Sequence, residues 1–323
     1  MKVQAVQVGS AVGQVLCAPI FHIGGKKLLA KGHQIREEDV RLLSLEGHAE
    51  VVVAVIEEDE IPEDRAALDL ATAAACGSLE IRLAAGGRVN LMATENCCLL
   101  LDEAVLGRFN ESGNVSIATM PNYSFAAAGQ RLASVKTAPF VIPKADFLKA
   151  QRLMKTKGPI LQARPIRDPA VAILYSDPRE AERARRLYEG IMKTRLDRFG
   201  AAAAFVLTAI EDESSVARAL DHLLRARPNV VLMASTTAPA GPQDTVGRAI
   251  EKIGCKRESF LAPVEPGNLL LLSYAGDVPV VAAPGCFRSP RPNVVDLVLP
   301  PLLASYHLTA HEVSSLGHGG LLS

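Results

Sequence analysis

The sequence predicts an α/β protein of two domains, residues 1–165 and 166–323. The first observation is the length of 323 residues, since domains average roughly 150 residues. The second is that apolar runs alternate with amphipathic helical patterns after residue 170, which is typical of a doubly wound, mainly parallel sheet with helices on both faces. The third is that residues 81–143 consist of short strand-like runs separated by Gly, Asn and Pro, which predicts a β-rich α+β N-terminal region.

Composition excludes several classes of protein. The 35 basic and 35 acidic residues give a formal net charge of zero, so the chain lacks the basic excess of a general nucleic-acid binder. No apolar stretch approaches the length of a transmembrane helix, and the N-terminus lacks the pattern of a signal peptide. The six dispersed cysteines and seven histidines form no metal-ligand spacing. We therefore expect a cytoplasmic protein with reduced thiols, no bound structural metal and no membrane or nucleic-acid partner.

The N-terminal region begins with short apolar runs and then a helix over residues 36–47, with acids in its first turn and Gly47 at its end. A valine-rich strand over residues 47–56 and an alanine-rich helix over residues 64–75 follow. The strand-like runs come next, at residues 88–93, 97–102, 115–120 and 131–142. A further helix and the turn-rich residues 162–169 lead into the second domain.

The second domain has a regular alternation of elements. Four apolar runs predict buried strands at residues 170–176, 205–210, 229–235 and 278–285. Apolar stripes at helical spacing separate them, and these stripes consist of Ala184, Leu187, Tyr188 and Ile191, then Val216, Ala219, Leu220, Leu223 and Leu224, then Val246, Ala249, Ile250 and Ile253. A final helix is expected from residue 293.

Ligands of open parallel sheets bind at the carboxyl ends of the strands. Three loops follow those ends, at residues 176–178, 236–241 and 284–290. The second loop leads into a helix that we expect Pro242 to open, and a helix N-terminus favours a phosphate or other oxyanion.

Two charged residues in these loops have both a functional and a structural explanation. Asp244, expected in the first helical turn, would hold a donor or a metal beside the anion, or would simply satisfy backbone N–H groups. Arg288 would clamp an oxyanion with its guanidinium, or would only pack on the neighbouring prolines. Taken singly, each residue is explained by its structural role.

Residues 229–304 resemble the molybdopterin-binding, MoaB/Mog-like domain of molybdopterin molybdenumtransferases, gephyrin and molybdopterin adenylyltransferases. In those proteins a buried strand is followed by a Ser-Gly-Gly-x-Ser-x-Gly-x-x-Asp loop. The corresponding residues here run from Ser235 through Thr236 and Thr237 to Gly241 and Asp244. The Pro284-Gly285 pair matches the Pro-Gly that precedes the family's last helix.

The resemblance extends over nearly the whole chain. It is closest to bacterial molybdopterin-binding proteins that are often joined to a C-terminal nucleotidyltransferase. Their short motifs have counterparts at residues 87–91, 117–121, 134–140, 264–270, 284–290 and 317–322. The chain ends at Ser323, where those relatives continue, so we expect either a free-standing form or a shortened one.

The resemblance implies a set of site residues and ligands. It implies molybdopterin as the ligand, with Mg²⁺ and ATP or AMP as further candidates. Asp244 and Asp177 take the catalytic positions. The residues implied to bind the pterin phosphate or an attached nucleotide are Ser235, Thr236, Thr237, Gly241, Pro284, Gly285, Arg288 and Ser289.

Two departures from the family pattern bear on activity. Thr236 and Thr237 replace the paired glycines, which reduces access of a phosphate to the backbone. Ser176-Asp177-Pro178 replaces the family's Thr-Gly-Asp-Glu-Leu. The sequence therefore predicts a molybdopterin binding or handover protein of molybdenum cofactor biosynthesis.

Alternatives to this function remain open. The chief alternative is a molybdenumtransferase or adenylyltransferase enzyme, and a non-catalytic sensor or assembly subunit is a third class. As partners we expect the pterin ligand, a second copy of the chain in a homo-oligomer, and a nucleotidyltransferase or another cofactor-biosynthesis protein.

Overall fold

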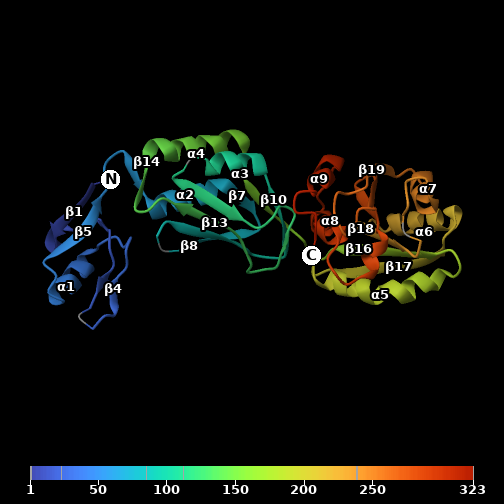
Figure 1. Ribbon diagram of the computed structural model, residues 1–323, viewed down its shortest axis with the longest axis horizontal. Coiled ribbons are helices and arrows are strands. Elements are labelled where there is room, and N and C mark those ends of the chain that lie inside the picture. Colours follow the sequence, from blue (N-terminus) through green and yellow to red (C-terminus); the bar gives the residue numbers. More distant parts are fainter. Residues whose placement is uncertain (1, 23, 85, 112, 238, 323) are drawn as a thin grey trace. The chain divides into compact units, whose positions relative to one another are not determined.

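A computed structural model describes residues 2–22, 24–84, 86–111, 113–237 and 239–322 of the chain (Figure 1). The chain forms two compact units. The first unit comprises Met1–Thr94, Leu101–Pro121 and Ala128–Ala163, and the C-terminal unit comprises Glu95–Leu100, Asn122–Ala127 and Arg164–Ser323. None of the described helices has the length and hydropathy needed to cross a bilayer.

The first unit begins with a three-stranded antiparallel sheet and one helix. In this sheet β5 lies between β1 and β2, and α1 ends before Gly47, whose φ of 80° suits glycine at a helix C-terminus. The predicted helix and valine-rich strand are thus present as α1 and β5. The bounds are β1 Lys2–Gln7, β2 Val15–Leu16, β3 Ile20–Phe21, β4 Lys27–Leu29, α1 Glu37–Leu45 and β5 Glu50–Val55, with a 3₁₀ turn at Val8–Ser10.

The remainder of the first unit is the β-rich region that the sequence predicts. Its main sheet has the order β11-β13-β9-β8 and is antiparallel throughout. The helix α2 packs on β9, β13 and α4, and its buried face is almost all alanine and leucine. The bounds are β6 Glu60–Pro62, α2 Glu63–Ala74, β7 Ala75–Gly77, β8 Leu79–Ala84, β9 Arg88–Ala93, α3 Glu103–Asn110, β11 Val115–Thr119, β13 Arg131–Thr137, β14 Val141–Pro143, α4 Lys144–Lys157 and β15 Leu161–Pro165.

The C-terminal unit contains a six-stranded sheet of order β17-β16-β18-β21-β20-β19. The first four strands are parallel, whereas β20 and β19 are antiparallel to their neighbours. The bounds are β16 Ala170–Asp177, α5 Ala181–Asp197, β17 Ala202–Ile210, α6 Glu213–Arg225, β18 Val230–Ser235, α7 Thr245–Lys252, β19 Lys256–Phe260, β20 Leu271–Ala275, β21 Val278–Ala282, α8 Val294–Leu303 and α9 Ala310–Ser315. The predicted doubly wound, mainly parallel fold is confirmed.

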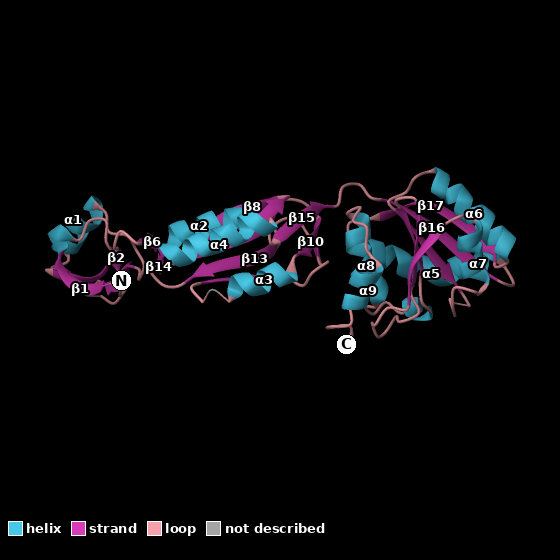
Figure 2. Cartoon of the chain, turned by 90° about the horizontal axis from the view of Figure 1, so that it is seen from above, coloured by secondary structure: helices cyan, strands magenta, loops and turns pink. Residues whose placement is uncertain are grey.

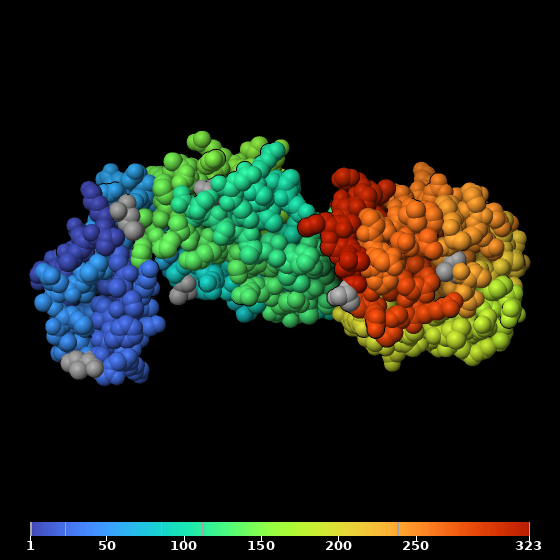
Figure 3. Space-filling model, viewed as in Figure 1, coloured from blue at the N-terminus to red at the C-terminus, as the bar shows by residue number. Residues whose placement is uncertain are grey.

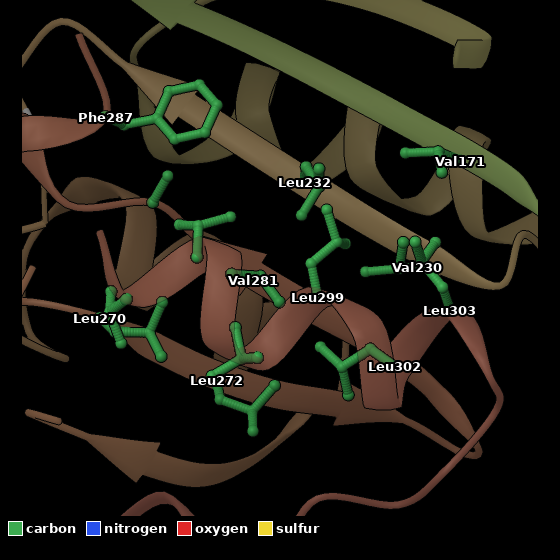
Figure 4. Close-up of a cluster of buried hydrophobic side chains, with 14 of the residues drawn as sticks. Val171, Val230, Leu232, Leu270, Leu272, Val281, Phe287, Leu299, Leu302 and Leu303 are labelled. Atoms are coloured by element: carbon green, nitrogen blue, oxygen red, sulfur yellow. The ribbon is translucent and has the colours of Figure 1, made fainter. Parts of the chain in front are cut away.

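Helices cover both faces of this sheet. One face packs on α5 and α8 through a core that includes Val171, Leu232 and Leu299 (Figure 4). The other face packs on α6 and α7 around Leu174 and Leu220. Figure 2 shows the strands between α8 on one side and α6 and α7 on the other. Successive residues of a strand point to opposite faces, so the continuous apolar run in β16 supplies both cores.

Some expected boundaries and faces were wrong. The strand predicted to begin at residue 205 begins at Ala202, because Ala202 and Ala203 extend its pairing with β16. The edge strand β19 and its neighbour β20 were not predicted. Leu187, expected on the buried stripe of its helix, is 52% exposed. The buried face of α5 instead consists of Ala184, Tyr188, Met192, Arg195 and Leu196, which places a cation in the apolar stripe.

Two segments from the middle of the sequence pack on the C-terminal unit. In β10 (Cys97–Leu101), Cys98 is fully buried in the core that contains β16 and α5. In β12 (Phe125–Ala126), Phe125 lies edge-on to Phe199 with ring centroids 5.6 Å apart. The backbone N–H of Ile166 also donates to the carbonyl oxygen of Asn96 at 2.8 Å. The C-terminal core therefore includes residues from two segments that lie before residue 130, well ahead of the rest of that core.

Candidate functional site

Asp177 ends β16 and is completely buried. Its Oδ1 accepts the backbone N–H groups of Arg179 and Glu180 at 2.8 and 3.0 Å. Its Oδ2 accepts the Arg183 guanidinium at 2.9 Å and the Thr236 hydroxyl at 2.6 Å. Burial by itself raises the pKa of Asp177, but the hydrogen bonds from Thr236 and the backbone, together with the charge of Arg183, lower it to about 2. Asp177 is therefore an ionised carboxylate with both oxygens occupied by donors.

The loop after β18 is tied to carboxylates on two sides. The Thr236 hydroxyl is bonded to Asp177, while the Ser235 and Thr237 hydroxyls both donate to Glu211, which follows β17. The Ser176 hydroxyl donates to the same Glu211 carboxylate at 3.1 Å. The order β17-β16-β18 brings these three strand ends together, because parallel strands end at one edge of the sheet. Both Thr236 and Thr237 thus hold the loop in place through their side chains.

The start of α7 differs from the expectation. Pro242 was expected to open this helix, but the helix begins at Thr245 and Asp244 is its N-cap. The Asp244 carboxylate accepts the backbone N–H groups of Gly247 and Ala240, both at 2.7 Å, and of Gly241 at 3.3 Å. A side-chain carboxylate thus occupies donors that the sequence suggested for a ligand phosphate.

The loop after β21 forms a short 3₁₀ helix, Gly285–Arg288, with Pro284 as its N-cap. The Arg288 side chain turns back toward β18, where its Nε donates to the Tyr188 hydroxyl at 2.9 Å and its Nη2 to the carbonyl oxygen of Thr236 at 2.6 Å. Arg288 therefore joins α5 to the loop after β18 and is not confined to packing on its flanking prolines.

Arg195 supports this loop from beneath and was not predicted. Its side chain is 2% exposed, forms an ion pair with Asp296, and donates to the carbonyl oxygen of Ser289 at 3.0 Å. Its guanidinium also lies 4.7 Å from the centre of the Phe287 ring, within cation–π range. An arginine in the apolar stripe of α5, seven residues after Tyr188, is the sequence signal that marks it.

A pocket of about 360 Å³ lies at this carboxyl edge of the sheet. Thr236 and Thr237 form one wall of the pocket, and Leu187 and Tyr188 form another. Its charged lining consists entirely of arginines, namely Arg179, Arg183 and Arg288. Arg183 also forms an ion pair with Asp177, whereas the Arg179 guanidinium has no acidic partner within the described part of the chain. The arrangement is suited to a ligand carrying two or more negative charges.

The structure brings together only some of the predicted site residues. Thr236, Thr237 and Arg288 line the pocket, and Asp177 lies directly behind Thr236. Ser235 is turned to Glu211, and Ser289 to Arg195 and Arg291. The other four predicted residues, Gly241, Asp244, Pro284 and Gly285, shape the neighbouring loops and are not among those that line the pocket.

Sequence reasoning missed Arg179, Arg183 and Glu211. The two arginines are four residues apart just beyond the loop at residues 176–178, and Glu211 directly follows a predicted strand. The two arginines could have been found by extending the loop at residues 176–178 into the helix that follows, and Glu211 by including the end of the strand predicted at residues 205–210. Among the described residues, histidine, cysteine and carboxylate side chains form no group that could hold a metal ion.

The chain was compared with protein families and with curated proteins. The sequence profile of a domain of unknown function, DUF8806, matches residues 5–55. No curated protein matches the sequence.

Among solved structures, the chain is similar to a molybdopterin biosynthesis MoeA protein from Pyrococcus horikosii, with 11% identity, a TM-score of 0.32, and coverage of 94% of this chain and 75% of that one. It is similar to a molybdenum cofactor biosynthesis protein from Pyrococcus furiosus, with 13% identity, a TM-score of 0.26, and coverage of 94% and 64%. It is also similar to the molybdopterin biosynthesis enzyme MoaB from Thermus thermophilus, with 14% identity, a TM-score of 0.32, and coverage of 46% and 97%. At these identities and TM-scores the likeness is one of fold, and the site is defined by the chain's own side chains.

Proposed function

We propose that this chain binds molybdopterin by its phosphate in the arginine pocket and serves as a binding or handover protein of molybdenum cofactor biosynthesis. The observation that carries the proposal is that Arg179, Arg183 and Arg288 surround one pocket at the carboxyl edge of a parallel sheet. Guanidinium groups recognise phosphate oxygens in pairs. The sequence resemblance suggests that the ligand is a pterin, and the arginines of the pocket provide positive charge that would bind its phosphate.

The donor set fits a phosphate better than it fits a metal ion. Three guanidiniums line the pocket, and guanidinium groups only donate hydrogen bonds, as an anion requires. The phosphate was expected at the start of the helix that follows the loop at residues 236–241. We place it elsewhere, because Asp244 already occupies the N–H groups of Ala240, Gly241 and Gly247. We therefore place the phosphate between the arginines, beside the side chains of Thr236 and Thr237.

The state of the carboxylates supports binding without efficient turnover. Asp177 is buried with four donors on its two oxygens, and Asp244 caps α7. A carboxylate that is to orient a metal or accept a proton needs an oxygen free for the reacting group. Neither Asp177 nor Asp244, the two predicted catalytic residues, has a carboxylate oxygen without a hydrogen-bond donor.

The alternative function is a molybdenumtransferase- or adenylyltransferase-like enzyme that uses Mg²⁺ and ATP. Glu211 favours it, because this half-buried carboxylate contacts Thr237 at the wall of the pocket. Glu211 would then be the acidic group nearest the bound phosphate. Its carboxylate receives three hydroxyl donors, which hold it in one orientation.

Substitution of Arg179 tests the binding site. Arg179→Ala is expected to weaken binding of purified molybdopterin by about 1.5–3 kcal/mol, the range for a hydrogen bond to a charged group, with little change in Tm because its guanidinium has no acidic partner in the described residues. Calorimetric titration measures the affinity. Arg291→Ala is the matched control, since this arginine is exposed and lies outside the pocket. Equal affinity of Arg179→Ala and the native chain would move the phosphate elsewhere.

A turnover assay separates binding from catalysis. The purified chain is incubated with molybdopterin, Mg-ATP and molybdate, and a known transferase is assayed in parallel. We expect bound pterin and negligible product. Turnover comparable to that of the transferase, abolished by Glu211→Gln, would replace the binding function by the enzymatic alternative.

A further inference from the structure

The helix α4 of the first unit concentrates positive charge on a chain whose net charge is zero. Its 14 residues include Lys144, Lys149, Arg152, Lys155 and Lys157, against Asp146 as the one acid. Asp146 is hydrogen-bonded to the Asn114 side chain. The helix packs its apolar face, Phe147, Ala150 and Met154, toward the unit's interior. Both α3 and α4 reach the molecular surface (Figure 3), where the basic side chains are exposed.

A groove of about 440 Å³ lies between α3 and α4. Its floor is apolar and includes Phe109, Ala150 and Leu153. Residues 149, 152, 153, 156 and 157 of α4 line it, and this spacing puts them on one face of the helix. The groove thus combines an apolar floor with side chains that extend from one helical face above it.

The rim of the groove is cationic. Arg108, Lys149, Arg152 and Lys157 line it, and Glu111 is the one acid among the lining residues. None of the four cations has an ion pair within the described ranges of the chain. Arg108 and Lys157 lie in the last turns of their helices, where they interact favourably with the helix dipole. Lys149 and Arg152 lie in the middle of α4, where the helix dipole does not stabilise a positive charge.

We infer that this groove binds a small amphipathic anion, a molecule with an apolar body and a carboxylate or phosphate group. The volume lies within the range of small-molecule sites, roughly 300–1,000 Å³. The apolar body would cover Leu153 and the edge of Phe109, and the anionic group would lie between Lys149 and Arg152. The site belongs to the first unit and is independent of the arginine pocket in the C-terminal unit.

Calorimetric titration of the full chain with octanoate and with 1-octanol tests the inference. The two probes share an apolar chain and differ in charge. We expect octanoate to bind one site on the chain at least tenfold more tightly than 1-octanol. Equal affinities would overturn the role of the cations, and absence of octanoate binding would overturn the site.

Charge reversal on α4 locates the bound anion. Lys149→Glu/Arg152→Glu is expected to weaken octanoate binding at least tenfold, and Leu153→Gln to weaken it while leaving the charge unchanged. The matched control is Lys144→Glu/Lys155→Glu, which makes the same change in charge on the same helix outside the groove. An equal loss in the control, or an acidic peptide that binds while octanoate does not, would overturn the inference. If the reversed variant does not fold, Lys149→Gln/Arg152→Gln gives the same test. The Arg179→Ala variant of the arginine pocket should bind octanoate normally.

Discussion

At the scale of single residues, Asp177 shows how a buried charge is stabilised at the sheet edge. An ionised carboxylate without partners is very costly in a protein interior. The cost of burying the Asp177 charge is offset by hydrogen bonds from two backbone N–H groups, the Thr236 hydroxyl and the Arg183 guanidinium. The arrangement closes the turn from β16 to α5 and fixes the position of Arg183 at the pocket.

The lowered pKa of Asp177 predicts a pH-dependent stability. Its folded-state pKa is about 2, below the ordinary value of 3.8, so the folded chain favours the ionised form. The stabilisation is complete above about pH 4 and is lost as the pH falls through 2. We expect Asp177→Asn to unfold at lower urea concentration than the native chain at pH 6, with the difference shrinking between pH 4 and pH 2. A difference that stays constant down to pH 2 would contradict this account.

At the scale of elements, the start of α7 depends on a close backbone approach. A Cβ atom added to Gly247 would lie far inside van der Waals contact with the carbonyl group of Pro242. The segment 240–244 therefore folds over the first turn of α7, where Asp244 caps it. This packing explains why the helix begins after Pro242 and not at it.

Alanine substitution of two glycines tests this packing. Alanine normally favours a helix over glycine by about 1 kcal/mol, but Gly247→Ala is expected to destabilise the chain by about 1–3 kcal/mol, as overpacked sites do. Gly241→Ala is the control, because a Cβ atom there meets open space, and it should change stability by less than about 0.5 kcal/mol. Urea denaturation measures both. A stabilising Gly247→Ala would show that the loop does not pack on the helix.

At the scale of the whole molecule, the C-terminal unit is discontinuous in sequence. Residues 95–100 and 122–127 belong to it, and Cys98 and Phe125 contact its core. Substitutions in the middle of the sequence should therefore affect the stability of the C-terminal sheet.

Phe125→Ala tests this division of the chain. Loss of the ring and of its contact with Phe199 should cost about 2–3 kcal/mol, somewhat below the 3–5 kcal/mol of a fully buried Phe→Ala change, since Phe125 is partly exposed. Hydrogen exchange should show faster exchange in β16 and α5, with β9 and β13 unchanged. Faster exchange confined to β9 and β13 would assign Phe125 to the first unit instead.

The sequence alone determined the fold class and the edge of the sheet that carries the site. Apolar runs in β16 and β18 and helical stripes in α6 and α7 depend only on local periodicity, and parallel strands end at a common edge. This reasoning selected the loops at residues 236–241 and 284–290, which contain Thr236, Thr237 and Arg288 of the pocket lining.

The tertiary structure decided what those residues contact. Arg183 lines the pocket and Arg195 supports the loop after β21 because of how α5 is oriented on the sheet, whereas Arg179 lines the pocket from the turn before α5. Glu211 joins the site because β17 pairs beside β16. Strand order and helix rotation arise from packing between residues far apart in the chain, which local periodicity does not encode.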